Sequence, residues 1–208
     1  MVYYIAMPAK NVVKLYASRS VYHVYNRGNN KQKIFLESAD YAAFLNLLKR
    51  HLSKVITSDK LGRQYKNWHG NIELLAFCLI PNHFHLLLYQ KHNSVITQLM
   101  KSITVSYSGY FNAKYSRTGH VFQGVFRASL IEEEPYWQHI SRYIHLNPRN
   151  WKSWEWSSLP YYLNKRRADW INPKRILETF EETNYLEFVS DYEDHKTMLD
   201  ELKYITAN

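Results

Sequence analysis

The sequence predicts an α+β fold, a ferredoxin-like or RRM-like antiparallel sheet with helices packed on it, followed by a C-terminal helical extension. Apolar residues follow the two-residue period of strands and the 3.6-residue period of helices in the order β-α-β-β-α-β-α. The 208 residues are 46% hydrophobic and 16% aromatic, enough to form the core of one domain. We see no internal repeat and no low-complexity linker.

The first half of the chain predicts three strands and one helix. Residues 20–28 (SVYHVYNRG) alternate and end in a turn signal, so they predict a strand. Residues 38–54 open with Ser-Ala-Asp and continue at helical spacing, which predicts a helix. The polar residues 57–71 are expected to form a loop. Residues 71–90 predict two apolar strands joined at Pro81-Asn82, a dipeptide typical of turns.

The second half predicts two helices, one strand and an extension. Residues 94–116 and 134–148 read as helices, the latter ending before Pro148 because the residue before a proline disfavours helical geometry. Residues 122–133 predict a strand. We expect residues 1–160 to form the main domain and 161–208 an extension with an acidic helical tail. That tail is expected to pack as an amphipathic helix through Phe180, Leu186, Phe188 and Leu199.

Charge is unevenly distributed. Of 27 Lys and Arg and 18 Asp and Glu, residues 177–208 hold two lysines and nine acidic residues, which leaves 25 basic and nine acidic residues in the first 176. A basic body rich in tyrosine favours nucleic acid as the partner, with a basic enzyme of another kind as the alternative. Cys78 is the only cysteine, and no apolar run reaches transmembrane length. We therefore expect a cytoplasmic protein with no membrane partner.

Two histidines stand out in the stretch IPNHFHLLL. On a strand, His83 and His85 project from one face and Phe84 from the other, so the imidazoles are placed to hold a divalent metal ion. A hydrogen-bonded pair without metal is the alternative, and more common for an isolated His-x-His. His23, on the first strand, either lines the same site or is a core histidine.

The third helix carries a second group of polar residues. Tyr143 and Asn147 are four residues apart and share a helical face. If that face lies near the histidines, the Asn147 amide oxygen is a candidate third metal ligand and the Tyr143 phenol a candidate nucleophile. A nearby cation and Arg142 would favour the phenolate. The alternative is that both residues are purely structural.

These blocks together carry a resemblance. YHVYNRG, IPNHFHLLL, FQGVFRASLI and SRYIHLNP, in this order over residues 20–160, resemble the HUH single-tyrosine transposases of single-stranded DNA, most closely the REP-associated tyrosine transposase (RAYT) branch. The family's His-hydrophobic-His motif corresponds to residues 83–85, its nucleophile to Tyr143 and its helical metal ligand to Asn147. The sequence departs at Val125, where members of the family often have a basic residue.

The resemblance implies a metal-dependent endonuclease and strand transferase of single-stranded, hairpin-containing DNA. Tyr143 would form a 5′-phosphotyrosine intermediate, and His83, His85 and Asn147 would hold Mg²⁺ or Mn²⁺. Two alternatives stay open: a non-catalytic RRM-like nucleic-acid-binding protein, and a metal-dependent phosphodiesterase that uses water. The resemblance fits either a monomer or a homodimer. Polar and basic residues expected to contact DNA are Arg27, Lys31, Lys33, Arg117, His120, Gln123, Arg127 and Arg142.

Overall fold

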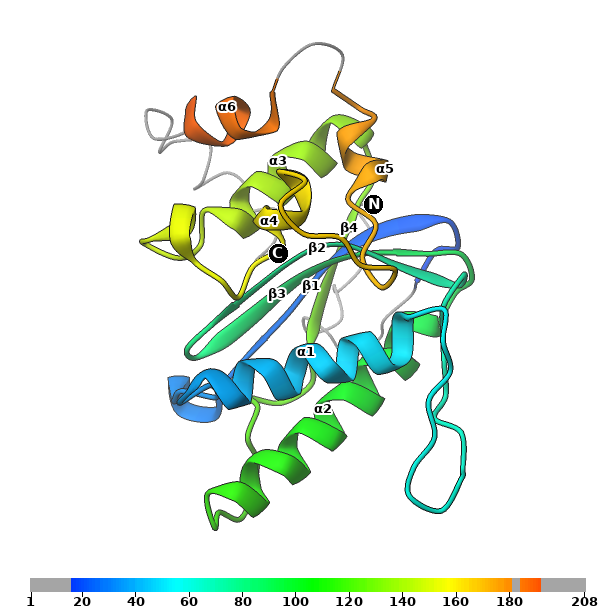
Figure 1. The fold of residues 1–208 in the computed structure, drawn as a ribbon, viewed down its shortest axis with the longest axis vertical. Coiled ribbons are helices and arrows are strands. Elements are labelled where there is room, and N and C mark those ends of the chain that lie inside the picture. The colour runs from blue at the N-terminus through cyan, green and yellow to red at the C-terminus, as the bar shows by residue number, and fades with distance from the viewer. Residues whose placement is uncertain (1–15, 181–183, 192–208) are drawn as a thin grey trace, which may run out of the picture.

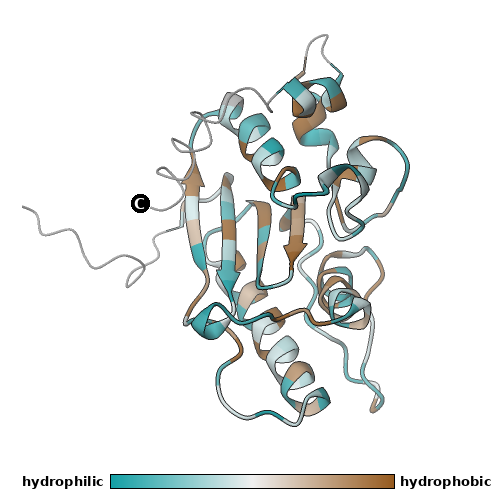
Figure 2. Ribbon diagram, turned by 90° about the vertical axis from the view of Figure 1, so that its left-hand side faces the viewer, coloured by the Kyte–Doolittle hydropathy of each residue, from teal (hydrophilic) through white to brown (hydrophobic). Residues whose placement is uncertain are grey.

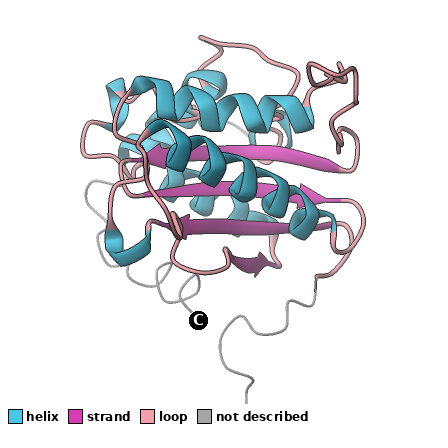
Figure 3. Cartoon of the chain, turned by 90° about the horizontal axis from the view of Figure 1, so that it is seen from below, coloured by secondary structure: helices cyan, strands magenta, loops and turns pink. Residues whose placement is uncertain are grey.

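Four antiparallel strands form one sheet in the order β2-β3-β1-β4. The computed structural model describes residues 16–180 and 184–191. Figure 3 shows the strands side by side beneath two long helices. The strands are β1 (Ser20–Arg27), β2 (Ile72–Ile80), β3 (His83–Gln90) and β4 (Arg127–Ile131). This arrangement confirms the predicted α+β fold, because β3 lies between β1 and β2 as in a split β-α-β unit.

Helices cover both faces of the sheet (Figure 1). One face carries α1 (Ser38–Leu52) and α2 (Val95–Lys114). The other carries α3 (Glu134–His145) together with shorter helices of the C-terminal part. These shorter helices are α4 (Leu159–Tyr162), α5 (Lys174–Leu177) and α6 (Tyr185–Ser190), and two 3₁₀ turns complete the structure, η1 (Asn29–Lys31) and η2 (Trp151–Ser153). None of the described helices is both long enough and apolar enough to span a membrane.

Alternating side chains of the central strands fill two cores. Val24 and Leu86 belong to the core under α1 and α2, whereas Val21 and Leu87 belong to the core under α3. Figure 2 shows the apolar stretches that run along the strands. Burying both faces excludes water from the sheet and leaves polar side chains inside it only where they have partners or a function.

A buried carboxylate joins the start of α1 to the end of α2. Asp40 is fully buried and accepts hydrogen bonds from Lys114 Nζ at 2.6 Å, Tyr110 Oη at 3.1 Å and Tyr115 Oη at 2.8 Å. Tyr107 and Phe111 of the same helix are core residues. These aromatic residues of α2 therefore hold the two helices together.

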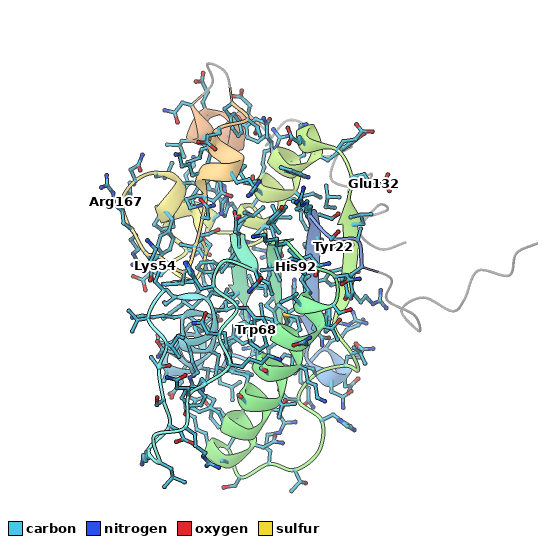
Figure 4. The ribbon with its side chains drawn as sticks, turned by 90° about the vertical axis from the view of Figure 1, so that its right-hand side faces the viewer. Tyr22, Lys54, Trp68, His92, Glu132 and Arg167 are labelled. Carbon is cyan, nitrogen blue, oxygen red and sulfur yellow. The ribbon has the colours of Figure 1, made fainter. Side chains whose placement is uncertain are left out.

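Residues 151–158, which follow α3 and include three tryptophans, cover the outer edge of β2. The Leu79 amide donates to the Trp156 carbonyl at 2.9 Å, and the Ser158 amide donates to the Phe77 carbonyl at 2.9 Å. An edge strand with free amide groups is a site for unwanted pairing, and this segment satisfies them. Figure 4 shows Tyr22 inside the molecule and Lys54 and Arg167 at its surface.

Two element boundaries and one packing contact differ from the sequence predictions. The predicted strand 122–133 forms β4 only from Arg127 to Ile131, because Gly124 has φ +71° and interrupts the regular pairing with β1, which Phe122 resumes as an isolated bridge to Gly28. Helix α3 ends at His145, so Asn147 lies just beyond it. In α6, Phe188 packs on the core but Leu186 is 38% exposed, and Leu199 lies outside the described residues.

Candidate active site

A cavity of about 370 Å³ opens where β1 ends and β3 and β4 begin. The register pairs Arg27 with His83 across β1 and β3, and Tyr25 with both His85 and Arg127. The antiparallel pairing thus gathers side chains that are about 100 positions apart in the chain. The cavity is lined by Tyr25, Asn26, Arg27, Lys31, Asn82, His83, His85, Gln123, Val125, Arg127 and Tyr143.

His83 and His85 project from the face of β3 that α3 covers, with their ring centroids 4.9 Å apart. Phe84 points into the opposite core, as the strand period predicted. His83 Nδ1 lies 2.7 Å from Asn82 Oδ1, an acceptor, so Nδ1 carries the proton and Nε2 carries the lone pair. His85 is 5% exposed, and its buried Nε2 has no hydrogen-bond partner among the described residues.

Both imidazoles are neutral at pH 7. Burial is the main cause that lowers the pKa of His83 to about 4. The Arg27 charge lowers this pKa further, whereas a hydrogen bond with the Asn147 side chain raises it. Burial, together with the neighbouring His23 and His83, holds the pKa of His85 well below its ordinary value. Neutral imidazole is the form that binds a metal ion, so the unpartnered Nε2 of His85 fits a cation ligand.

Tyr143 and Asn147 lie beside these histidines. The Tyr143 ring meets the His85 ring edge to face at 5.6 Å, and the Asn147 side chain hydrogen bonds with His83. Within residues 16–180 and 184–191, no three His, Cys, Asp or Glu side chains are arranged to hold a metal. The predicted donor set is of another kind, two imidazoles and an amide oxygen, and the structure brings these three residues together.

The remaining wall of the cavity is basic. Arg27, Lys31 and Arg127 line it, and none of the lining residues is acidic. The Arg27 guanidinium hydrogen bonds to Gln123 Oε1, which fixes both side chains at the mouth. Three cations beside a potential metal site form a surface suited to the phosphates of a nucleic-acid strand.

Three predicted DNA contacts lie outside this cavity. Lys33 is exposed and does not line it. Arg117 hydrogen bonds to Gln32 and stacks on Phe111. His120 lines a second cavity of about 620 Å³ between α2 and residues 119–126, which shares Asn26 and Val125 with the first.

Arg142 does not take the predicted position. It is 6% exposed, its Nη1 donates to the Phe188 carbonyl at 3.0 Å, and its guanidinium lies over the Phe188 ring. Its Nη2 also lies 2.9 Å from His139 Nδ1. The side chain is therefore turned toward α6 and does not line the cavity, so this geometry gives no support to the prediction that Arg142 contacts DNA and favours the phenolate.

His23 lies closer to the site than the sequence indicated. It projects on the α3 side of the sheet, and its Nε2 lies 2.8 Å from His85 Nδ1. The period of β1 places His23 on the same face as Tyr25, but only the pairing with β3 shows that this is the face of His83 and His85. That register could not be read from either strand alone.

Comparison with known proteins identifies the family of this chain. A family model described as "Transposase IS200 like" matches residues 17–147. No curated protein matches the chain. The structure of a REP-associated tyrosine transposase bound to a REP hairpin is similar over 84% of this chain and 96% of that one, with 12% identity and a TM-score of 0.53. A putative transposase from Deinococcus radiodurans R1 is 16% identical over 64% of this chain and 93% of that one, with a TM-score of 0.40.

The family model covers well over half of the chain, including every residue of the candidate site. The structural likeness to the REP-associated enzyme, at its low identity, supports the fold. The predicted membership of the single-tyrosine transposases is confirmed. The chain belongs to the IS200-like family of transposases, enzymes that cut and rejoin DNA.

Proposed function

We propose that this chain cuts and rejoins single-stranded DNA through a covalent intermediate on Tyr143. The observation that carries the proposal is the contact between the Tyr143 ring and His85, whose Nε2 is buried and unpartnered, in a cavity with a basic wall. A nucleophile, a potential cation site and phosphate-binding groups are the parts that phosphodiester transfer requires.

In the proposed reaction, the Tyr143 oxygen loses its proton and forms a bond to the scissile phosphorus. The bond from phosphorus to the 3′ oxygen breaks, and that oxygen takes up a proton to become a free hydroxyl. The DNA 5′ end is then held as a phosphotyrosine ester. Attack by a 3′ hydroxyl on this ester rejoins the strands and returns the phenol. The number of phosphodiester bonds is conserved, so no energy source is needed.

We assign the metal ligands to His83, His85 and Asn147. The neutral imidazoles and the amide oxygen suit Mn²⁺ or Mg²⁺. A cation bound there would offset charge on the scissile phosphate and on the phenolate. Arg27 and Arg127 are placed to hold the phosphate backbone against the site, and Gln123 orients Arg27.

We propose hairpin-containing DNA as the substrate. The structurally similar transposase is a complex with a REP hairpin. The RRM-like alternative is not favoured, since RRM proteins stack bases on an open sheet face and here helices cover both faces.

An adduct assay tests the proposal. The protein is incubated with labelled single-stranded hairpin DNA and Mn²⁺ or Mg²⁺, and the products are run on a denaturing gel. We expect a slowly migrating protein–DNA band that disappears with EDTA and in Tyr143→Phe and His85→Ala. Tyr136→Phe is the matched control, because this tyrosine of α3 is 41% exposed and does not line the cavity.

Other outcomes would point elsewhere. Metal-dependent cleavage that survives Tyr143→Phe, with no adduct, would make the protein a phosphodiesterase that uses water. Tight binding with neither cleavage nor adduct, for all hairpins and metals tried, would make it a binding protein.

A further inference from the structure

His23 is a buried histidine that the proposed chemistry does not use. It is 1% exposed and its ring lies edge to edge with that of His85, with centroids 5.0 Å apart and planes 12° apart. Its Nε2 lies 2.8 Å from His85 Nδ1, and its own Nδ1 has no hydrogen-bond partner among the described residues. The contact with His85 is therefore the one hydrogen bond of the His23 side chain among the described residues.

One proton lies between the two rings. If His85 Nδ1 carries it, His23 Nε2 accepts and the His85 Nε2 is a bare lone pair. If His23 Nε2 carries it, His85 Nδ1 accepts and the remaining proton of His85 must sit on Nε2. Only the first arrangement leaves His85 able to bind a cation, so the partner of Nδ1 decides whether this residue is a ligand.

At His83 too, the hydrogen-bond partner of Nδ1 fixes the tautomer. Its Nδ1 faces Asn82 Oδ1 at 2.7 Å, so the side chain next to it in sequence sets its tautomer. His85 has no such neighbour, because Phe84 and Leu86 point into the opposite core. The position that reaches His85 Nδ1 is on the adjacent strand β1, and His23 occupies it.

We infer that His23 is a positioning residue whose Nε2 accepts a hydrogen bond from the Nδ1–H of His85 and so presents the His85 Nε2 lone pair to the divalent cation. The inference rests on the proposed function of the site. A neutral imidazole with no partner favours the Nε2–H form, which cannot bind a metal ion through that nitrogen. Because His23 is 1% exposed and His85 5% exposed, bulk solvent does not compete for the hydrogen bond between them, so the loss of this acceptor should be felt.

Two substitutions of His23 separate this role from packing. His23→Phe keeps an aromatic ring but removes the acceptor, whereas His23→Gln can place an amide oxygen near the position of Nε2. Binding of Mn²⁺ is followed by electron paramagnetic resonance without DNA. We expect His23→Phe to weaken Mn²⁺ binding by about 10- to 100-fold and His23→Gln to restore most of it.

The tautomer provides a direct second measurement. In long-range ¹H–¹⁵N spectra of the metal-free protein, His85 of the wild type should be protonated at Nδ1, and in His23→Phe at Nε2. If His23→Phe is folded, binds Mn²⁺ as the wild type does and leaves His85 protonated at Nδ1, the inference is wrong. A His85 protonated at Nε2 in the wild type would also overturn it.

The proposed function can fail separately. If the wild type neither binds Mn²⁺ nor forms an adduct, the metal site itself is refuted. If the wild type does both and His85→Ala does neither, while His23→Phe matches the wild type, only the role of His23 is refuted.

Discussion

Residues that are neighbours in this sequence do not necessarily point to the same part of the structure. Arg142 and Tyr143 are neighbours in sequence, yet neighbouring positions on a helix point in different directions. Tyr143 therefore faces the cavity while Arg142 faces Phe188. The four-residue spacing of Tyr143 and Asn147 was the more reliable guide, even though α3 ends before Asn147.

The two lysines after β1 offer a matched test at this scale. Lys31 lines the cavity and Lys33 does not, and both are exposed. We expect Lys31→Ala to weaken binding of single-stranded DNA and to reduce the magnitude of the slope of log K against log salt by about 0.7, the value for one phosphate contact. Fluorescence anisotropy at several salt concentrations measures both. Lys33→Ala should change the slope less. Equal effects of the two substitutions would show that Lys31 makes no specific phosphate contact at the cavity.

At the scale of elements, a buried chain of hydrogen bonds fixes the helix that carries Tyr143. Ser158 Oγ accepts from the Phe77 amide at 2.8 Å and lies 2.6 Å from His145 Nε2. His145 Nδ1 lies 2.6 Å from Tyr185 Oη, which also contacts Ser141 Oγ at 2.9 Å. These hydrogen bonds thus connect β2, α3 and α6 through side chains that the surrounding core shields from water.

Removing one hydroxyl group from this set of hydrogen bonds should lower the stability of the fold. Tyr185→Phe leaves His145 Nδ1 buried without its partner, which we expect to lower the free energy of unfolding by roughly 1–3 kcal/mol. Urea denaturation measures this change. Leu186→Ala in the same helix is the control, because Leu186 is partly exposed and its loss should cost about 0.5 kcal/mol or less. Equal effects would mean that α6 contributes packing alone.

The Asp40 contacts make the α1–α2 pair sensitive to acid. Burial alone would raise the pKa of Asp40, but hydrogen bonds from Lys114, Leu36, Tyr115 and Glu37 lower it below its ordinary value. Asp40 therefore stabilises the fold above about pH 3.9, the pKa of an unfolded aspartate, and this contribution is lost as the pH falls through the lower folded-state pKa.

We accordingly expect Asp40→Asn to lower the melting temperature at pH 7 and to differ less from the wild type near pH 3. Thermal denaturation followed by circular dichroism at both pH values checks this. A difference that does not change with pH would assign the effect to packing instead of charge.

The strands and helices were predictable because each has its own period, whereas their ends and pairings were not. Helical spacing located α1 and α2 to within two residues at each end. The shortening of β4 depends on the left-handed turn at Gly124, and the position of His23 depends on strand register. The inward turn of Arg142 depends on α6, a helix more than 40 residues later in the chain. Such features are set by tertiary contacts, which local pattern does not contain.

For the whole molecule, the residues that line the candidate cavity all come from one chain. Tyr143 contacts the histidines of its own chain, and α3 is tied to the C-terminal part of that chain through Tyr185. We predict that mixing Tyr143→Phe with His85→Ala restores no adduct. Adduct recovered in the mixture would show that the tyrosine of one copy serves the histidines of another.

This arrangement has a kinetic consequence. When nucleophile and ligands belong to one polypeptide, no encounter between two protein molecules precedes cutting. The rate constant for cleavage on saturating DNA should then stay the same as the protein is diluted, and the reaction should be first order in protein. A single copy bound to DNA would be a complete catalyst, so a low protein concentration would lower the frequency of binding and leave the rate of cutting on bound DNA unchanged.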